Sequence, residues 1–137
     1  MTKELWMNLP VKDLARSKEF YNAIGFKIGE GMGNSPVTAP LIVGTKGTMI
    51  MLFQEEAFKT VTQNGLTDTA TGTEVLFSFD AETEQEVNVI AEKVAAAGGN
   101  VFAPPSLIQG WMYGCAFCDL DGHRWNALHM DMNNMPR

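Results

Sequence analysis

The sequence has few basic side chains and few cysteines, and it contains no long apolar run. Its 10 lysines and arginines are outnumbered by 16 aspartates and glutamates, which gives a net charge of −6. Because nucleic-acid binding needs a basic face that displaces counterions, we expect no nucleic-acid partner. No segment approaches the roughly 20 apolar residues of a membrane-spanning helix, and the charged opening residues lack a signal-peptide pattern. These absences predict a cytoplasmic protein with no membrane partner.

The two cysteines, Cys115 and Cys118, have the C-x-x-C spacing of a redox or metal-binding motif. The surrounding residues 113–119 instead have the pattern of a β-strand. Residues three apart on a strand point to opposite faces, so these thiols are not expected to bind one ion or to form one disulfide. We predict two structural thiols in a reducing compartment.

An internal repeat is the main organising feature of the chain. In the first half, an extended segment (5–11) is followed by a helix at 14–23, which Asp13 caps and Gly25 ends. In the second half, a strand (74–80) is followed by a helix that starts at the capping-box pair Thr83 and Glu86 and ends at Gly98-Gly99. Three strand candidates then follow in each half: 26–31, 38–43 and 48–54, and then 101–104, 113–119 and 124–130.

The repeat predicts the fold class and the domain organisation. A half of about 65 residues is marginal alone, so we expect one domain, 1–137, with a shared core. Module one covers about 1–58, a polar flexible connector about 59–72, and module two about 73–137. The predicted fold is α+β, with two βαβββ modules in tandem forming a curved mixed sheet around a cleft. Strand alternation places Trp6 and Asn8 opposite the apolar face of the first strand, and it places Glu74 in the cleft.

Two segments carry a family resemblance. Residues 9–21, LPVKDLARSKEFY, followed by Gly25-Phe26, resemble the opening module of vicinal oxygen chelate proteins, the glyoxalase and bleomycin-resistance superfamily. Residues 117–126, FCDLDGHRWN, resemble the closing hairpin of that superfamily. The resemblance covers nearly the whole chain and implies the fold and a homodimer. It does not imply one activity, because the superfamily contains lyases, isomerases, dioxygenases, transferases and drug-binding proteins.

The resemblance also implies where a metal would bind, at Trp6, Met51, Glu74 and Asn126. Only Glu74 is a good ligand for a hard divalent ion. Asn126 is a weak neutral donor, a thioether is too soft, and indole offers no lone pair. A different alignment that recruits Asn8 in place of Trp6 would still leave one carboxylate and two amides. We therefore expect no tightly bound catalytic metal and no other cofactor, with weak divalent binding at Glu74 and Asn126 left open.

The remaining candidates form a binding surface. Glu74 is the candidate catalytic acid or base, because burial in an apolar cleft would suit it to proton transfer; the alternative is a solvated strand end. Trp6, Met51, Trp111 and Tyr113, together with Asn8 and Asn126, are candidate substrate-binding residues, although the aromatic side chains also suit a module seam or a dimer interface. His123, in a turn, and His129, opposite Asn126 by alternation, are expected to be ordinary histidines.

These observations leave three functions open. The first is a small-molecule binding protein or metal-independent enzyme with its ligand in the cleft. The second is a metal-dependent enzyme of the lactoylglutathione lyase type, in which Glu74 moves a proton, or a related isomerase or dioxygenase. The third is non-catalytic sequestration of a drug, for which the acidic balance favours a cationic ligand.

Overall fold

The computed structural model describes residues 1–136 and divides the chain into two units, Met1–Asp68 and the segment from Thr69 onward. Each unit contains one four-stranded mixed sheet. The predicted α+β class with two tandem βαβββ modules is confirmed. Within the described residues, no helix is long and apolar enough to cross a membrane.

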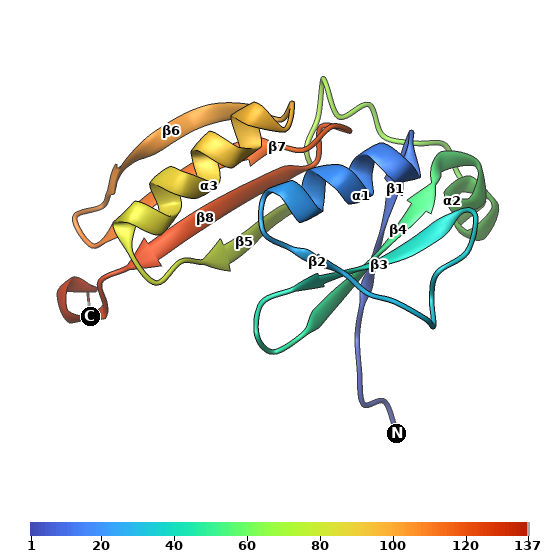
Figure 1. Ribbon diagram of the computed structural model, residues 1–137, viewed down its shortest axis with the longest axis horizontal. Coiled ribbons are helices and arrows are strands. Elements are labelled where there is room, and N and C mark those ends of the chain that lie inside the picture. Colours follow the sequence, from blue (N-terminus) through green and yellow to red (C-terminus); the bar gives the residue numbers. More distant parts are fainter. Residues whose placement is uncertain (137) are drawn as a thin grey trace. The chain divides into compact units, whose positions relative to one another are not determined.

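The first unit contains four strands and two helices (Figure 1). In chain order they are β1 (Met7–Val11), α1 (Leu14–Ala23), β2 (Lys27–Ile28), β3 (Thr38–Val43), β4 (Thr48–Gln54) and α2 (Glu55–Thr62). The sheet order is β1-β4-β3-β2, in which β1 and β4 are parallel and the other pairs are antiparallel. α1 packs on one face of this sheet, where Phe20 and Tyr21 are buried with the strand residues Leu41, Ile50 and Leu52.

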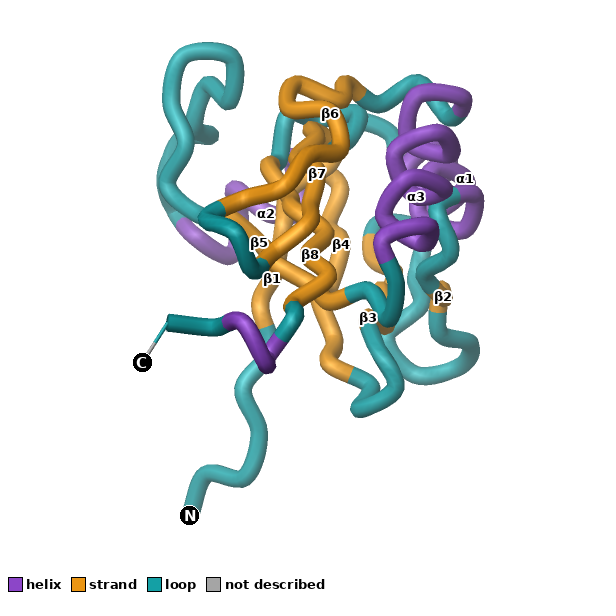
Figure 2. Tube along the Cα trace, turned by 90° about the vertical axis from the view of Figure 1, so that its left-hand side faces the viewer, coloured by secondary structure: helices purple, strands orange, loops and turns teal. Residues whose placement is uncertain are grey.

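The second unit repeats this arrangement with the order β5-β8-β7-β6. Its elements are β5 (Leu76–Asp80), α3 (Glu84–Ala96), β6 (Asn100–Ile108), β7 (Met112–Cys118), β8 (Arg124–Met130) and a short 3-10 helix, η1 (Met132–Asn134). β5 and β8 are parallel, and β8, β7 and β6 are successively antiparallel. Figure 2 shows α3 lying along one side of its strands.

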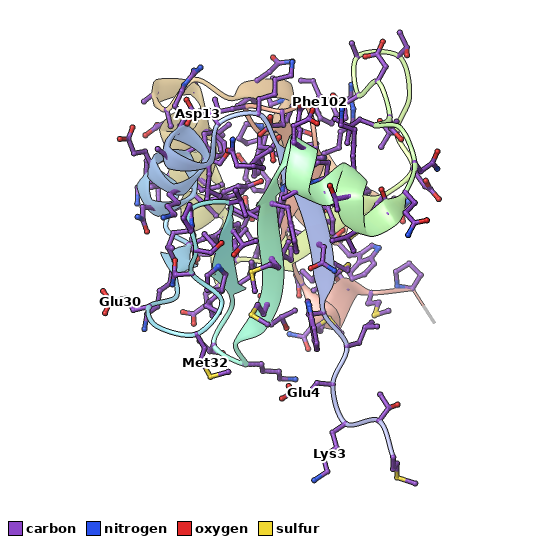
Figure 3. The ribbon with its side chains drawn as sticks, turned by 90° about the vertical axis from the view of Figure 1, so that its right-hand side faces the viewer. Lys3, Glu4, Asp13, Glu30, Met32 and Phe102 are labelled. Atoms are coloured by element: carbon purple, nitrogen blue, oxygen red, sulfur yellow. The ribbon has the colours of Figure 1, made fainter. Side chains whose placement is uncertain are left out.

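The two long helices begin at the capping residues that the sequence predicts. The Asp13 side chain accepts a hydrogen bond from the backbone N–H of Arg16, and the Thr83 hydroxyl accepts one from the N–H of Glu86 at 3.0 Å. Asp13 lies at the start of α1 in Figure 3. Each cap satisfies one of the N–H groups that the first turn of a helix leaves free.

An aromatic cluster around Trp125 determines which face of the second sheet is buried. The Trp125 side chain is 1 % exposed, and its ring lies 4.9 Å from that of Phe77 and 6.4 Å from that of Phe117. These rings lie on the side of α3, with the buried helix residues Val87 and Val94. Since successive strand residues alternate, the neighbours of Trp125 along β8 face away from the helix.

The structure differs from the sequence prediction at several elements: β1 begins at Met7 rather than at 5, and β2 covers only Lys27–Ile28 of the predicted 26–31. α2 includes residues 59–62, which we expected in the flexible connector. It has only eight residues, and none of them is buried; Phe58 packs on Phe53 with 6.3 Å between ring centroids. β6 extends to Ile108 with two register shifts, and β5 begins at Leu76 rather than at 74.

Candidate functional site

The second sheet has a polar row on the face opposite α3, which we call the helix-distal face. Ser78 on β5, Asn126 on β8 and Ala116 on β7 are register partners, so their side chains lie next to one another on this face. Leu76, Arg124 and Cys118 form the next row. Asn126 was predicted from the sequence as a site residue and Arg124 was not, although a spacing of two residues along a strand indicates a shared face.

The side-chain Oδ1 of Asn126 is a buried acceptor without a donor in the described part of the chain. The residue is half-buried, and its side-chain Oδ1 has no hydrogen-bond partner among residues 1–136. Leaving such an acceptor unsatisfied costs about 1–3 kcal/mol, and most buried polar atoms in folded proteins have a partner. Of its row neighbours, Ala116 offers no side-chain donor and the Ser78 hydroxyl does not donate to this oxygen, so a ligand with an N–H or O–H group is a chemically suitable partner.

Arg124 supplies positive charge on the same face. Its guanidinium carbon lies 4.3 Å from the centroid of the Phe102 ring, a cation–π geometry. Within the part of the chain that the structure describes, no carboxylate forms an ion pair with this guanidinium. The guanidinium therefore has an aromatic support, and its charge and that of Asp119 both act on the neighbouring Cys118 thiol.

The charge of Arg124 affects the pKa of the neighbouring Cys118 thiol. Burial raises the pKa of the Cys118 thiol, and the Arg124 charge partly offsets that rise. Burial also raises the pKa of Cys115, on the opposite face. Both cysteines are buried and free, which confirms the prediction that they form no disulfide.

Glu74 lies outside the strand in which the sequence analysis placed it. It occupies an exposed bend two residues before β5, so strand alternation does not direct it toward the helix-distal face. The structure therefore does not place this carboxylate in the desolvated position that was expected.

In the first unit, the candidate residues Asn8 and Met51 lie side by side. They are register partners on β1 and β4, and Pro40 on β3 completes the row. Trp6 immediately precedes β1 and is 49 % exposed.

The loop between β2 and β3 passes close to this row. A Cβ added at Gly33 would lie 2.9 Å from Met51 Cε, and one at Gly29 would lie 3.0 Å from Pro40 Cγ. Glu30 and Met32 point outward from the loop (Figure 3). Met51 therefore packs under the loop rather than lying fully open.

Tyr113 and Asn126 do not share a face. The Tyr113 hydroxyl donates to Asn88 Oδ1 of α3 at 2.7 Å, which places Tyr113 on the helix side of the sheet. His129 also lies on that side, where its Nδ1 is 3.1 Å from the carbonyl oxygen of Ala81. Trp111 lies in the turn between β6 and β7, and its buried Nε1 lacks an acceptor among the described residues.

The residues at the implied metal positions do not fit a hard divalent ion. Trp6 and Met51 of the first unit supply an indole and a thioether, and Glu74 and Asn126 of the second supply one carboxylate and one amide. Across residues 1–136, no three histidine, cysteine, aspartate or glutamate side chains are grouped to hold an ion. This donor set offers too little negative charge to offset dehydration of the ion.

Two tandem units, each joining a parallel strand pair to an antiparallel meander, define the vicinal oxygen chelate class of fold. Residues 3–36 match the family described as bleomycin resistance protein-like N-terminal. A hypothetical protein from S. aureus is 37 % identical, with 94 % of each chain covered and a TM-score of 0.84. The fold and the matched residues 3–36 are thus similar to those of the vicinal oxygen chelate superfamily.

More distant structures share the fold. A glyoxalase/bleomycin resistance protein/dioxygenase family enzyme from Burkholderia phytofirmans is 22 % identical, with 91 % of this chain and 96 % of that chain covered and a TM-score of 0.78. The fosfomycin resistance protein FosX from Listeria monocytogenes is 17 % identical, with 97 % of each chain covered and a TM-score of 0.66. No curated protein matches the chain.

Proposed function

We propose that the chain binds a small molecule on the helix-distal face of its second sheet, without a tightly held catalytic metal. The observation that carries this proposal is the buried Asn126 Oδ1 that lacks a donor. A donor from a ligand would remove the cost of burying this oxygen unsatisfied. The exposed Ser78 hydroxyl beside Asn126 provides a second polar group, which can donate or accept a hydrogen bond.

The resemblance to the superfamily supports the general class of function proposed, which is small-molecule binding. The superfamily's members include binding proteins and enzymes that act on small molecules, and FosX is a resistance protein to the small antibiotic fosfomycin. The donor chemistry at the implied metal positions favours a member that binds its ligand through hydrogen bonds.

Nuclear magnetic resonance of metal-depleted, ¹⁵N-labelled protein tests the proposal. A set of neutral, anionic and cationic compounds, cationic antibiotics included, is titrated while the side-chain amide signal of Asn126 is followed. The Asn126→Leu variant assigns that signal, and the side-chain amide of Asn22, exposed on α1, serves as the internal control. We expect at least one compound to shift the Asn126 signal and leave Asn22 unchanged.

The metal arm uses calorimetry with zinc, nickel, manganese and iron(II). We expect no stoichiometric binding at micromolar affinity. Binding at that affinity to the wild-type chain, reduced in Glu74→Gln, would overturn the metal-free part of the proposal. If no compound shifts the Asn126 signal, the binding part fails.

The second candidate is an enzyme of the lactoylglutathione lyase type, and it rests on Glu74. The exposed position of Glu74 before β5 leaves its carboxylate accessible to a substrate in solution. Turnover of the methylglyoxal–glutathione adduct that is lost in Glu74→Gln but kept in Glu82→Gln would support it. Absence of turnover with any added metal would exclude it.

A further inference from the structure

Resting on the proposed function, we infer that the ligand of the helix-distal face is a small anion that also carries a hydrogen-bond donor. Arg124 binds the anionic group, and Asn126 Oδ1 accepts from the donor. The sequence as a whole is acidic, so this ligand class is opposite to the one that the net charge of −6 favours. The inference rests on the position of the Arg124 charge on this face, and the net charge of the chain does not enter it.

The guanidinium of Arg124 is restrained in a position where it can bind an anion. Its contact with the Phe102 ring, labelled in Figure 3, restrains a side chain that would otherwise lose conformational freedom on binding. Arg124 is half-buried, so water screens its charge less than that of an exposed arginine. The acidic residue on the same face, Asp80, is at the far end of β5, whereas Leu76 at the near end is the register partner of Arg124.

The positions of the two groups set the size of the ligand. The side chain of Arg124 starts on β8 and reaches the ring of Phe102 on β6, with β7 between these strands. Arg124 and Asn126 are two residues apart on β8, so their Cα atoms are about 6.6 Å apart. A ligand that engages both side chains must span a separation of that order between its charge and its donor.

Ala116 leaves space for the part of the ligand that joins its charge to its donor. It lies on β7 in the same row as Asn126, and its methyl group is the only side chain of that row position between β8 and β6. A larger side chain at this position would occupy the space between the two polar groups while leaving both of them in place.

Three matched probes separate the contributions of charge and donor. 4-Hydroxybutyrate carries both groups, butyrate carries only the anion, and 1,4-butanediol carries only donors. Each is titrated into the ¹⁵N-labelled full chain at constant ionic strength, with the Asn126 side-chain and Arg124 Nε–H signals followed. We expect 4-hydroxybutyrate to bind about five-fold more tightly than either partial probe, as one additional hydrogen bond or charge contact allows.

Substitutions locate the binding. Arg124→Gln should abolish the preference for 4-hydroxybutyrate over butanediol, and Arg124→Lys should retain part of it because the charge remains. Arg16→Gln removes an exposed arginine from α1 and is the matched charge control, with no effect expected. Ala116→Leu should weaken 4-hydroxybutyrate binding with both polar groups intact. A cooperative urea transition in each variant confirms that it is folded.

The outcomes distinguish this inference from the proposed function. If butanediol binds as tightly as 4-hydroxybutyrate, or if Arg124→Gln binds both as the wild type does, the anion inference is overturned and small-molecule binding stands. The same holds if none of the three probes shifts the two signals while neutral or cationic compounds of the wider set do. If no compound of either set shifts the Asn126 signal, both proposals fall.

Discussion

Asn126 can be identified as a site residue from the sequence, but the lack of a hydrogen-bond donor for its side-chain oxygen cannot. The position after the Asp121-Gly122 turn marks it as a site residue through the family resemblance. Its unsatisfied Oδ1 depends on Ser78 and Ala116, which belong to other strands. An acceptor retained at a cost in stability is typical of a functional position.

The first prediction concerns the cost of that acceptor. Replacing Asn126 with leucine removes a buried oxygen without a donor and keeps a similar volume. We expect Asn126→Leu to raise the free energy of unfolding by about 1 kcal/mol, measured by urea denaturation. The same variant should lose the ligand response.

Asn88 is the matched control for this prediction. Its Oδ1 accepts from the Tyr113 hydroxyl at 2.7 Å, so Asn88→Leu leaves a part-buried hydroxyl without its acceptor. We expect this variant to lower the free energy of unfolding by about 1 kcal/mol. Equal destabilisation by both substitutions would show that Asn126 is an ordinary structural amide.

At the scale of elements, local signals specified the helices and strands unevenly. α1 runs from Leu14 to Ala23 as predicted, because Asp13, the apolar spacing and Gly25 are all local features. α2 was missed because it is short and buries no residue. β5 lacks the predicted residues 74 and 75. The end of a strand depends on its partner strand, and the pairing of β5 with β8 begins at Leu76 and Arg124.

A second prediction concerns how much the N-terminal cap of α3 contributes to the free energy of unfolding. The Thr83 hydroxyl accepts from the Glu86 N–H, and the Glu86 carboxylate accepts from the N–H of Glu82 at 2.9 Å. We expect Thr83→Ala to lower the free energy of unfolding by about 1 kcal/mol, because an N–H of the first turn loses its partner.

Thr83→Ser keeps the hydroxyl and serves as the control, with a change of a few tenths of a kcal/mol expected. Thermal and urea denaturation followed by circular dichroism measure both variants. A Thr83→Ala variant as stable as Thr83→Ser would show that the cap contributes nothing to the second unit.

At the scale of the whole molecule, the structure shows two units of like topology, and the assembly remains a prediction. The family resemblance implies a homodimer. Several large apolar side chains of the described residues are exposed, among them Leu76 at 52 % and Leu107 at 66 %. Leu76 on β5 and Leu107 on β6 lie at opposite edges of the second sheet, so the predicted homodimer rests on the family resemblance.

We therefore expect sedimentation equilibrium to give twice the chain mass of 15.0 kDa at micromolar concentration. Leu107→Lys, which places a charge at an exposed apolar position of β6, is a first variant to locate the interface, and Val61→Lys on α2 is its matched control in the first unit. A wild-type chain that sediments at 15.0 kDa would contradict the predicted homodimer.

The sequence by itself determined the tandem βαβββ order, the capped helices and the opposite faces of the two cysteines. These features follow from spacing, turn residues and strand alternation, which act between near neighbours or repeat regularly along the chain. Only the tertiary structure decided that Asn126 Oδ1 is buried without a donor, that Arg124 lies over Phe102, and that Tyr113 faces α3. Each of these depends on strand register, which brings together residues far apart in the chain.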